Sequence, residues 1–208
     1  RPLMMGVVNV TPDSFSDGGR YLDVEAAVAH AIQLVEEGAD VLDVGAESTR
    51  PGADPVDEAE ELRRAIPVVT AVAKAVTVPI SIDTSKSSVA QAALDAGAVL
   101  VNDVTALRGD PAMAEIIART GAGIVLMHMQ GTPRTMQQVP HYEDVIGEVA
   151  VFFEERIRFA TTHGIVQRQI VLDPGIGFGK LLVHNLALLA RLQRFACFGC
   201  PLLVGVSR

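Results

Sequence analysis

One stretch of the chain, VLDVGAESTRPGA at residues 41–53, most strongly limits the folds that this sequence can adopt. It begins with the apolar run 41–44, of the kind that forms a strand buried on both faces of a sheet. It then changes at residues 47–52 to polar groups and turn formers, and a helix with regular apolar spacing is expected next. This order of strand, polar exit and helix recurs along nearly the whole chain.

The repeat predicts seven strands that alternate with six helices. Strands are expected at residues 3–10, 41–44, 79–83, 99–104, 123–129, 170–173 and 202–206. The helix after the second strand is predicted to start at an N-cap, Asp57, because Glu60 follows at the spacing of a capping box. Its apolar positions at helical spacing are Leu62, Ile66, Val69, Ala73 and Val76.

Strict alternation at this spacing indicates parallel strands joined by right-handed crossovers. An open doubly wound sheet and a closed barrel both fit this pattern, and the number of strands favours the barrel. A complete (β/α)₈ TIM barrel takes about 250 residues, whereas this chain of 208 residues stops just after the seventh strand. The prediction is therefore one α/β barrel domain spanning 1–208, truncated so that strand eight and two helices are absent.

Composition and charge narrow the class of protein. Hydrophobic residues make up 49% of the chain, which is ample for one sizeable core. The net charge of −8 disfavours a general nucleic-acid binder, although local cations still allow a small anionic ligand. No apolar run reaches the length of a membrane span and no signal-peptide pattern is present, so a cytoplasmic protein is expected. Cys197 and Cys200 are expected to be reduced thiols in a loop.

Polar side chains follow the predicted strands at their C-terminal ends, which converge on one mouth of a barrel. Any single one could cap the next helix or satisfy a turn. Capping does not require so many acids and amides directed at one axis, so the whole set predicts a site. The residues are Asn9, Glu47, Thr49, Arg50, Asp83, Asn102, Asp103, His128, Asp173, Ser207 and Arg208.

The residue types at these exits suggest the ligand. Two aspartates and an asparagine suit a flat heterocycle, because a carboxylate accepts two hydrogen bonds from adjacent N–H groups and an amide both gives and takes one. Thr49 and Arg50 suit an anion, since a guanidinium binds phosphate oxygens in a forked geometry. Asn9 offers a neutral oxygen that suits Mg²⁺. The residues alone therefore predict a phosphorylated heterocycle with a metal ion. His128 is expected to be a histidine satisfied near the mouth rather than a catalytic base.

Several motifs, in this order, resemble the dihydropteroate synthase family over almost the whole chain. They are NVTPDSFSDGG (9–19), GAESTRPGA (45–53), ISIDTSK (80–86), Asn102-Asp103, LMHMQGTP (126–133), LDPGIGFGK (172–180) and LLVGVSR (202–208). The first two are long and highly specific. The resemblance implies a TIM-barrel transferase of folate biosynthesis. This enzyme joins 6-hydroxymethyl-7,8-dihydropterin pyrophosphate to p-aminobenzoate and releases pyrophosphate, with Mg²⁺.

The resemblance also implies roles for individual residues. Asp83, Asn102 and Asp173 would hold the pterin, and Asn9 would bind the metal. Asp83 and Arg50 would be the catalytic residues. Lys180 is assigned no catalytic role.

Other residues would form the second half of the predicted site. Thr49 and Arg50 would meet the pyrophosphate and, with Pro51, Phe178 and Ser207, border the aminobenzoate pocket. The loops 11–19 and 47–53 would close over the substrates, with Phe15 and Asp17 in the first of them.

The family pattern departs from this chain at its C-terminal end. The lysine after the Ser-Arg pair and the Arg-x-His of strand eight would both lie past Arg208, which predicts a poorly active fragment. The complete protein is expected to be a homodimer. Two rivals remain: a corrinoid-type methyltransferase with a similar pterin set, and a paralogue or fragment that binds the pterin without catalysing a reaction. Pyrophosphate release would separate them.

Overall fold

The computed structural model describes residues 1–10, 20–47, 55–132 and 134–206. These residues fall into two compact units. The first contains residues up to Asn102 and the second contains those from Asp103 onward. Each unit is considered by itself, and the single domain expected from the sequence stays a prediction.

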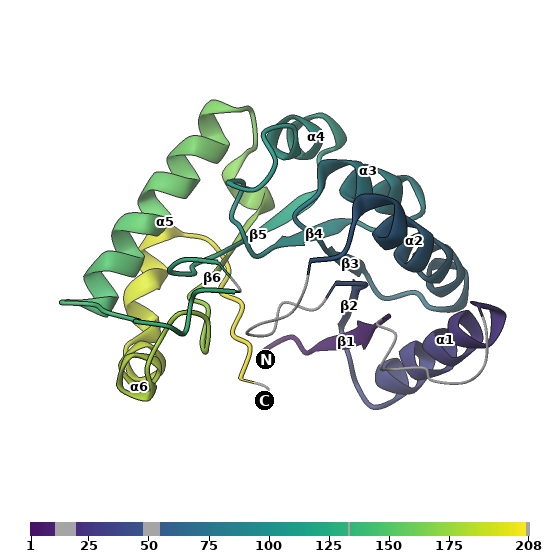
Figure 1. Cartoon of the computed structure of the whole chain (residues 1–208), viewed down its shortest axis with the longest axis horizontal. Helices are drawn as coiled ribbons and strands as arrows, with labels where there is room; N and C mark the ends of the chain where they lie inside the picture. The colour runs from purple at the N-terminus through teal and green to yellow at the C-terminus, as the bar shows by residue number, and fades with distance from the viewer. Residues whose placement is uncertain (11–19, 48–54, 133, 207–208) are drawn as a thin grey trace. The chain divides into compact units, whose positions relative to one another are not determined.

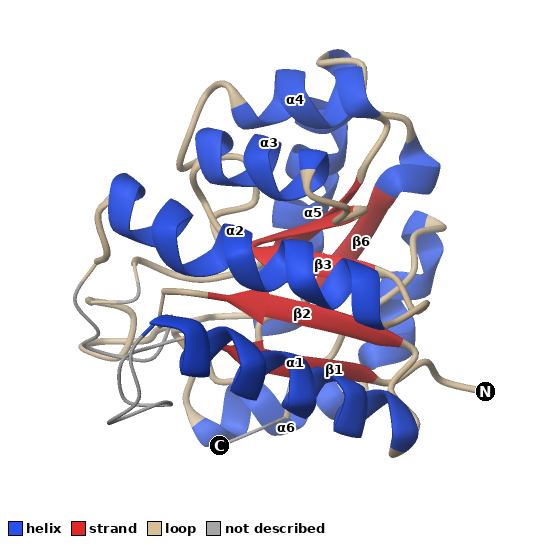
Figure 2. Cartoon of the chain, turned by 90° about the vertical axis from the view of Figure 1, so that its right-hand side faces the viewer, coloured by secondary structure: helices blue, strands red, loops and turns tan. Residues whose placement is uncertain are grey.

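The first unit is a layer of parallel strands with helices packed against it (Figure 1). Strand β1 pairs with β2, β2 with β3 and β3 with β4, always in parallel. Figure 2 shows α1 and α2 side by side in front of these strands. The elements are β1 (Met5–Asn9), α1 (Arg20–Glu36), β2 (Val41–Gly45), α2 (Glu58–Ala75), β3 (Ile80–Asp83), α3 (Ser87–Asp95) and β4 (Leu100–Asp103).

The second unit repeats the same arrangement. Strand β5 pairs in parallel with β6, and α5 contacts α6 and the 3₁₀ helix η3. Its elements are α4 (Met113–Thr120), β5 (Gly123–Met127), α5 (Val145–Thr162), η2 (Gln167–Gln169), β6 (Ile170–Asp173), α6 (Leu182–Ala190) and η3 (Leu192–Phe198). Cys197 therefore lies in η3 rather than in the predicted loop, and both Cys197 and Cys200 are free thiols.

Helix α2 begins where the sequence predicts. The Asp57 carboxylate accepts a hydrogen bond from the backbone N–H of Glu60 at 2.9 Å, so Asp57 is the N-cap. The Glu60 carboxylate binds Arg63 and Arg64 further along the helix. The N-cap is thus confirmed, and its acidic first turn also suits the positive end of the helix dipole.

The buried face predicted for α2 is wrong, because the observed one is displaced by about one residue along the helix. The fully buried positions are Glu61, Ala65, Val68, Val69 and Val72, whereas Leu62, Ile66 and Ala73 are only half-buried. The reason is that α2 packs against β2 and also against α1 and α3.

The predicted seventh strand is wrong over most of its length. Leu202 forms one isolated bridge with Leu172, flanked by two backbone hydrogen bonds. Residues 203–206 have no regular secondary structure. The next donor on β6 in this pattern would be residue 174, which is a proline and has no backbone N–H to continue the ladder.

The buried face of α2 includes one acid, Glu61, whose charge is balanced by a nearby lysine. Glu61 is fully buried, and its Oε2 lies 2.5 Å from Nζ of Lys86, which also binds Glu47. Burial lowers the pKa of Lys86, but hydrogen bonds and charge from Glu47 and Glu61 outweigh burial, and the net shift is upward. Lys86 therefore links the end of β2, the start of α3 and the first turns of α2.

Replacing Lys86 tests this link. Lys86→Met leaves the Glu61 carboxylate buried without its cation, and loss of one partner of a buried ion pair costs about 3 kcal/mol or more. We expect the free energy of unfolding, measured in urea at neutral pH, to fall by that amount. The control is Lys74→Met on the exposed last turn of α2, which should change it little. Equal effects of the two substitutions would contradict the link.

Candidate active site

The resemblance gives a role to eleven residues, of which the structure describes five: Asn9, Asp83, Asn102, Asp173 and Phe178. The other six lie outside the described part of the chain, and they are Phe15, Asp17, Thr49, Arg50, Pro51 and Ser207. Arg208, the last of the strand-exit residues, lies outside it as well.

The strand register of the first unit brings three of these residues to one level of the sheet. Asn9 pairs with Gly45, Gly45 with Asp83, and Asp83 with Asn102. The first three are the last residues of their strands, and Asn102 is the last but one of β4. Adjacent strands lie about 4.8 Å apart. The first unit therefore aligns the predicted metal ligand with two predicted pterin ligands across four strands.

Gly45 keeps space open in this row. A Cβ atom at this position would lie 3.3 Å from Cβ of Asp83 and 3.5 Å from its Oδ2. These distances leave almost no room for a side chain beside the carboxylate. The glycine of the GAESTRPGA motif thus allows Asp83 to occupy the space between its neighbours.

Two residues below this row, on the same face of β2 as Gly45, lies a residue that the sequence did not bring out. Asp43 on β2 pairs with Ser81 on β3, and its Oδ2 accepts a hydrogen bond from Nδ2 of Asn102 at 2.9 Å. Asp43 is only 5% exposed. The signal in the sequence is a single acid inside the otherwise apolar run Val41 to Val44, a pattern that by itself predicts only a strand.

Asp103, the neighbour of Asn102, has a structural role. Its buried carboxylate accepts hydrogen bonds from the N–H and hydroxyl of Thr105 and from the N–H of Leu107. Burial raises the pKa of Asp103, and these hydrogen bonds oppose the rise. They stabilise a turn in which Ala106 and Leu107 have positive φ angles of 53° and 63°.

In the second unit, Asp173 ends β6 as the sequence predicts. Its Oδ1 accepts a hydrogen bond from the N–H of Gly175 at 2.7 Å, and its side chain is almost fully buried. Burial raises the pKa of Asp173 to about 6, opposed by that hydrogen bond and by the charge of Lys180. Because Asp173 belongs to the second unit, its proximity to Asp83 and Asn102 stays a prediction.

Lys180 is held inside the loop that follows Asp173. Its Nζ donates to the carbonyl oxygens of His128, Gly175 and Phe178 at 3.1, 2.9 and 2.9 Å, which uses all three N–H groups. Burial lowers the pKa of Lys180 to about 7, while the charge of Asp173 opposes that shift. The lysine thus organises the PGIGFGK loop around the end of β6.

His128 is unsuited to proton transfer at neutral pH. Burial, together with the charges of Lys180 and Arg108, lowers the pKa of His128 to about 3. The imidazole is packed edge-on against Phe152, with ring centroids 4.9 Å apart. The structure therefore disfavours a catalytic base. The expected satisfied histidine is not confirmed, because Nδ1 of His128 is buried with no hydrogen-bond partner among the described residues.

Phe178, predicted to border the aminobenzoate pocket, lies on an apolar cluster. It is half-buried and packs against Val104, Met127, Met129 and Met136. These contacts hold the ring in place while leaving part of it exposed, as a pocket wall requires.

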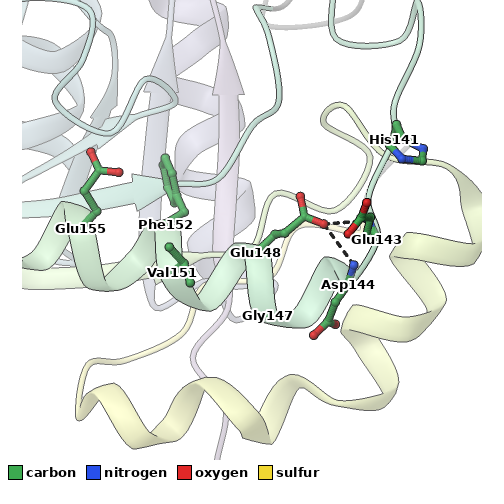
Figure 3. A pocket seen from close by; sticks show the side chains of 8 residues that line it. All are labelled: His141, Glu143, Asp144, Gly147, Glu148, Val151, Phe152 and Glu155. Carbon is green, nitrogen blue, oxygen red and sulfur yellow. Dashed lines mark hydrogen bonds between the residues drawn. The ribbon is translucent and has the colours of Figure 1, made fainter.

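The second unit also has a pocket of about 670 Å³ along α5, and none of the residues that line it is a predicted site residue (Figure 3). Four of its lining residues are acidic: Glu143, Asp144, Glu148 and Glu155. Glu148 accepts hydrogen bonds from the N–H groups of Glu143 and Asp144 at the start of the helix. This acidic lining is unsuited to a pyrophosphate group.

Two further properties follow from the described residues. No three His, Cys, Asp or Glu side chains among them are grouped to hold a metal ion. None of the helices in the described ranges is long and apolar enough to cross a membrane.

Comparison with known proteins identifies the class. The family model described as "Pterin binding enzyme" matches residues 5–208, so the chain belongs to the pterin-binding enzyme family. Within that family its relatives are dihydropteroate synthases. The protein of this name from Escherichia coli K12 is 51% identical over 207 residues, covering 100% of this chain and 73% of the relative. That from Synechocystis is 45% identical over 208 residues, covering 100% and 72%.

Solved structures give the same result. The Yersinia pestis dihydropteroate synthase in complex with a sulfonamide drug has a TM-score of 0.93 and 47% identity, covering 100% of this chain and 75% of that one. The Xanthomonas albilineans enzyme with 4-aminobenzoic acid has a TM-score of 0.92 and 51% identity, covering 100% and 73%. The same enzyme with 7,8-dihydropteroate has a TM-score of 0.87 and 47% identity, covering 100% and 73%. The predicted α/β TIM-barrel class is confirmed, and the chain spans about three quarters of these relatives.

Two glycines in the loop around Lys180, Gly175 and Gly177, differ in the space that surrounds them. At Gly175, φ is +65° and an added Cβ would lie 2.0 Å from the carbonyl oxygen of His128, whereas Gly177, with φ of +85°, has nothing within 4 Å. Gly175→Ala should lower the free energy of unfolding by about 3 kcal/mol or more, through both backbone strain and overlap. Gly177→Ala should lower it by only about 1–2 kcal/mol. Chemical denaturation measures both, and equal losses would contradict the close packing at Gly175.

Proposed function

We propose that this chain carries out the dihydropteroate synthase reaction, as a transferase of folate biosynthesis. It would condense 6-hydroxymethyl-7,8-dihydropterin pyrophosphate with p-aminobenzoate to give 7,8-dihydropteroate and pyrophosphate. The observation that carries the proposal is the alignment of Asn9, Asp83 and Asn102 at one level of the sheet, in a chain 51% identical to a dihydropteroate synthase.

The pterin would be held by Asp83, Asn102 and Asp173. A carboxylate accepts hydrogen bonds from two adjacent N–H groups, which matches the 2-amino-pyrimidine edge of a pterin. The amide of Asn102 supplies a further polar contact. Asp83 and Asn102 are cross-strand neighbours, so both can contact one flat ring.

Asn9 would bind Mg²⁺. It is exposed at the end of β1, and its side-chain oxygen is a neutral ligand of the kind that a hard cation accepts. One such ligand is compatible with Mg²⁺, which keeps several waters and is commonly completed by substrate phosphates. When bound, the ion would neutralise charge on the pyrophosphate.

The reaction would proceed with departure of the pyrophosphate before attack. The bond between the pterin methylene carbon and the pyrophosphate oxygen breaks, and that oxygen keeps the electron pair. Arg50 and Thr49 would stabilise the departing anion, and Asp83 would stabilise the positive charge that spreads from the methylene into the ring. The amine of p-aminobenzoate then forms the new C–N bond and loses one proton.

Other residues would exclude water from this cation, which would otherwise be hydrolysed. Pro51, Phe178 and Ser207 would border the aminobenzoate. The segments 11–19 and 47–53 would close over the substrates, with Phe15 and Asp17 in the first. Phe178 is supported in this role by its packing on the methionine cluster.

Location and assembly are part of the proposal. A cytoplasmic homodimer is what the resemblance implies. The apolar side chains Leu182, Val183 and Leu186 on α6 are exposed, as expected of a surface that meets another protein surface. No nucleic-acid partner is proposed.

Pyrophosphate release tests the function. With both substrates and Mg²⁺, the protein should release pyrophosphate and form dihydropteroate. Asp83→Asn and Asn102→Ala should each lower kcat/KM by about 100-fold, since each loses contacts to the reacting ring. Asp95→Asn, an exposed carboxylate on α3, should leave kcat/KM unchanged. Pterin binding without pyrophosphate release would instead support the binding-only alternative.

The pH dependence of pterin binding tests Asp173 separately. This side chain accepts two hydrogen bonds only as the carboxylate, and its pKa is about 6. Affinity for 6-hydroxymethyl-7,8-dihydropterin should therefore be full above pH 6 and fall as pH drops through 6, approaching tenfold per pH unit. In Asp173→Asn, affinity should be weaker at pH 7 and lack this fall. Calorimetric titration between pH 7 and 5 measures it, and a level profile for the unaltered protein would contradict the assignment.

A further inference from the structure

Asp43 is a buried acid with no cation partner among the described residues. Its side chain lies inside the first unit, two residues below the row of Asp83 and Asn102 in the strand register. The ion pairs of the described residues do not include it. Burial raises the pKa of Asp43, opposed by the Ser81 hydroxyl and the Asn102 amide. A valine or leucine would fill a strand position of this kind without the desolvation cost.

Among the described residues, the one hydrogen bond that Asp43 makes at normal geometry goes to a predicted ligand residue. Nδ2 of Asn102 donates to Oδ2 of Asp43 at 2.9 Å, whereas Oδ1 of Asp43 and Oγ of Ser81 have no partner at normal geometry in the part of the chain that the structure describes. Asp43 is buried, while Asn102 is half-buried. The hydrogen bond thus connects the interior of the unit to a side chain that reaches its surface.

This contact determines which way the Asn102 amide faces. An asparagine amide has two ends of nearly the same shape, one that donates and one that accepts, and a flip exchanges them. A carboxylate only accepts, so the NH₂ end must face Asp43. The carbonyl oxygen of Asn102 is then the end left for a ligand.

We propose that Asp43 is a positioning residue that holds the Asn102 amide with its carbonyl oxygen toward the pterin, so that this position recognises an N–H donor. This inference rests on the proposed function and adds to it the identity of the atom that Asn102 presents. Asp43 acts through Asn102 and does not itself touch the substrate. A ring that presents an acceptor at the same place would bind more weakly, because two acceptors would face each other without a hydrogen atom between them.

The kinetic experiment compares three proteins. Asp43→Asn removes the preference for one orientation of the Asn102 amide, because two facing amides can form a hydrogen bond in either direction. We expect KM for the pterin substrate to rise about tenfold or more, with KM for p-aminobenzoate unchanged. The exchanged double variant Asp43→Asn/Asn102→Asp keeps an amide–carboxylate hydrogen bond and always presents an acceptor at position 102. It should recover most of the lost pterin affinity, although the two residues have changed places.

A control variant and two contrary outcomes complete the kinetic test. Asp95→Asn should leave both KM values unchanged. If Asp43 serves only to hold the strands together, the pterin KM of Asp43→Asn will match that of the unaltered protein once both are folded. Failure of the double variant to recover affinity beyond the single variant would also overturn the proposal.

A spectroscopic measurement on the unaltered protein does not depend on catalytic activity. One Asn102 side-chain N–H bound to a carboxylate should resonate downfield of its geminal partner and exchange slowly in a ¹H–¹⁵N spectrum, with the assignment made from Asn102→Asp. An Asn102 amide with two averaged, fast-exchanging N–H groups would overturn the inference. If the shifted resonance is present but no pyrophosphate is released, the proposed function has failed while the amide orientation stands.

Discussion

The parallel register of β1 to β4 is the constraint on which the candidate site of the first unit depends. Each strand pairs with the next so that Asn9, Gly45, Asp83 and Asn102 occupy one row, with Asp43 and Ser81 two residues below it. Because side chains alternate between the faces of a strand, a slip of one residue would direct Asp83 toward the helices. The pairing of backbones therefore brings together residues that are far apart in the chain.

Buried charge near the strand ends is stabilised in a different way at each position. Glu61 has the ammonium of Lys86, Lys180 has three carbonyl oxygens, and Asp103 has the N–H groups of a tight turn. Each arrangement supplies the hydrogen bonds that water would otherwise provide. Each also fixes the backbone next to a strand exit, so the same contacts that make burial tolerable hold the site residues in place. Asp43 differs because its contact is directed at a proposed ligand residue.

Local sequence patterns predicted where helices and strands lie better than they predicted which side of a helix is buried. The N-cap at Asp57 and the strand that ends at Asp173 were found from the sequence, since each depends on residues a few positions apart. The buried stripe of α2 and the strand at 202–206 were wrong. The first depends on which neighbours surround the helix, and the second fails because Pro174 cannot donate to the next rung. The sequence does not predict a role for Asp43, because the role of an acid within an apolar run depends on its cross-strand neighbours.

The sequence by itself determined the α/β class, the order of strands and helices, and a family assignment that rests on long motifs at the strand exits. It also supplied Asn9, Asp83 and Asn102 as candidates, because polar groups after buried strands are recognisable without coordinates. Only the tertiary structure decided that these three share a row, that Lys180 is enclosed by carbonyl oxygens, and that Asp43 orients the amide of Asn102. The physical reason is that motifs are set by neighbours along the chain, whereas hydrogen bonds between distant side chains depend on strand register and burial, which exist only once the chain has folded.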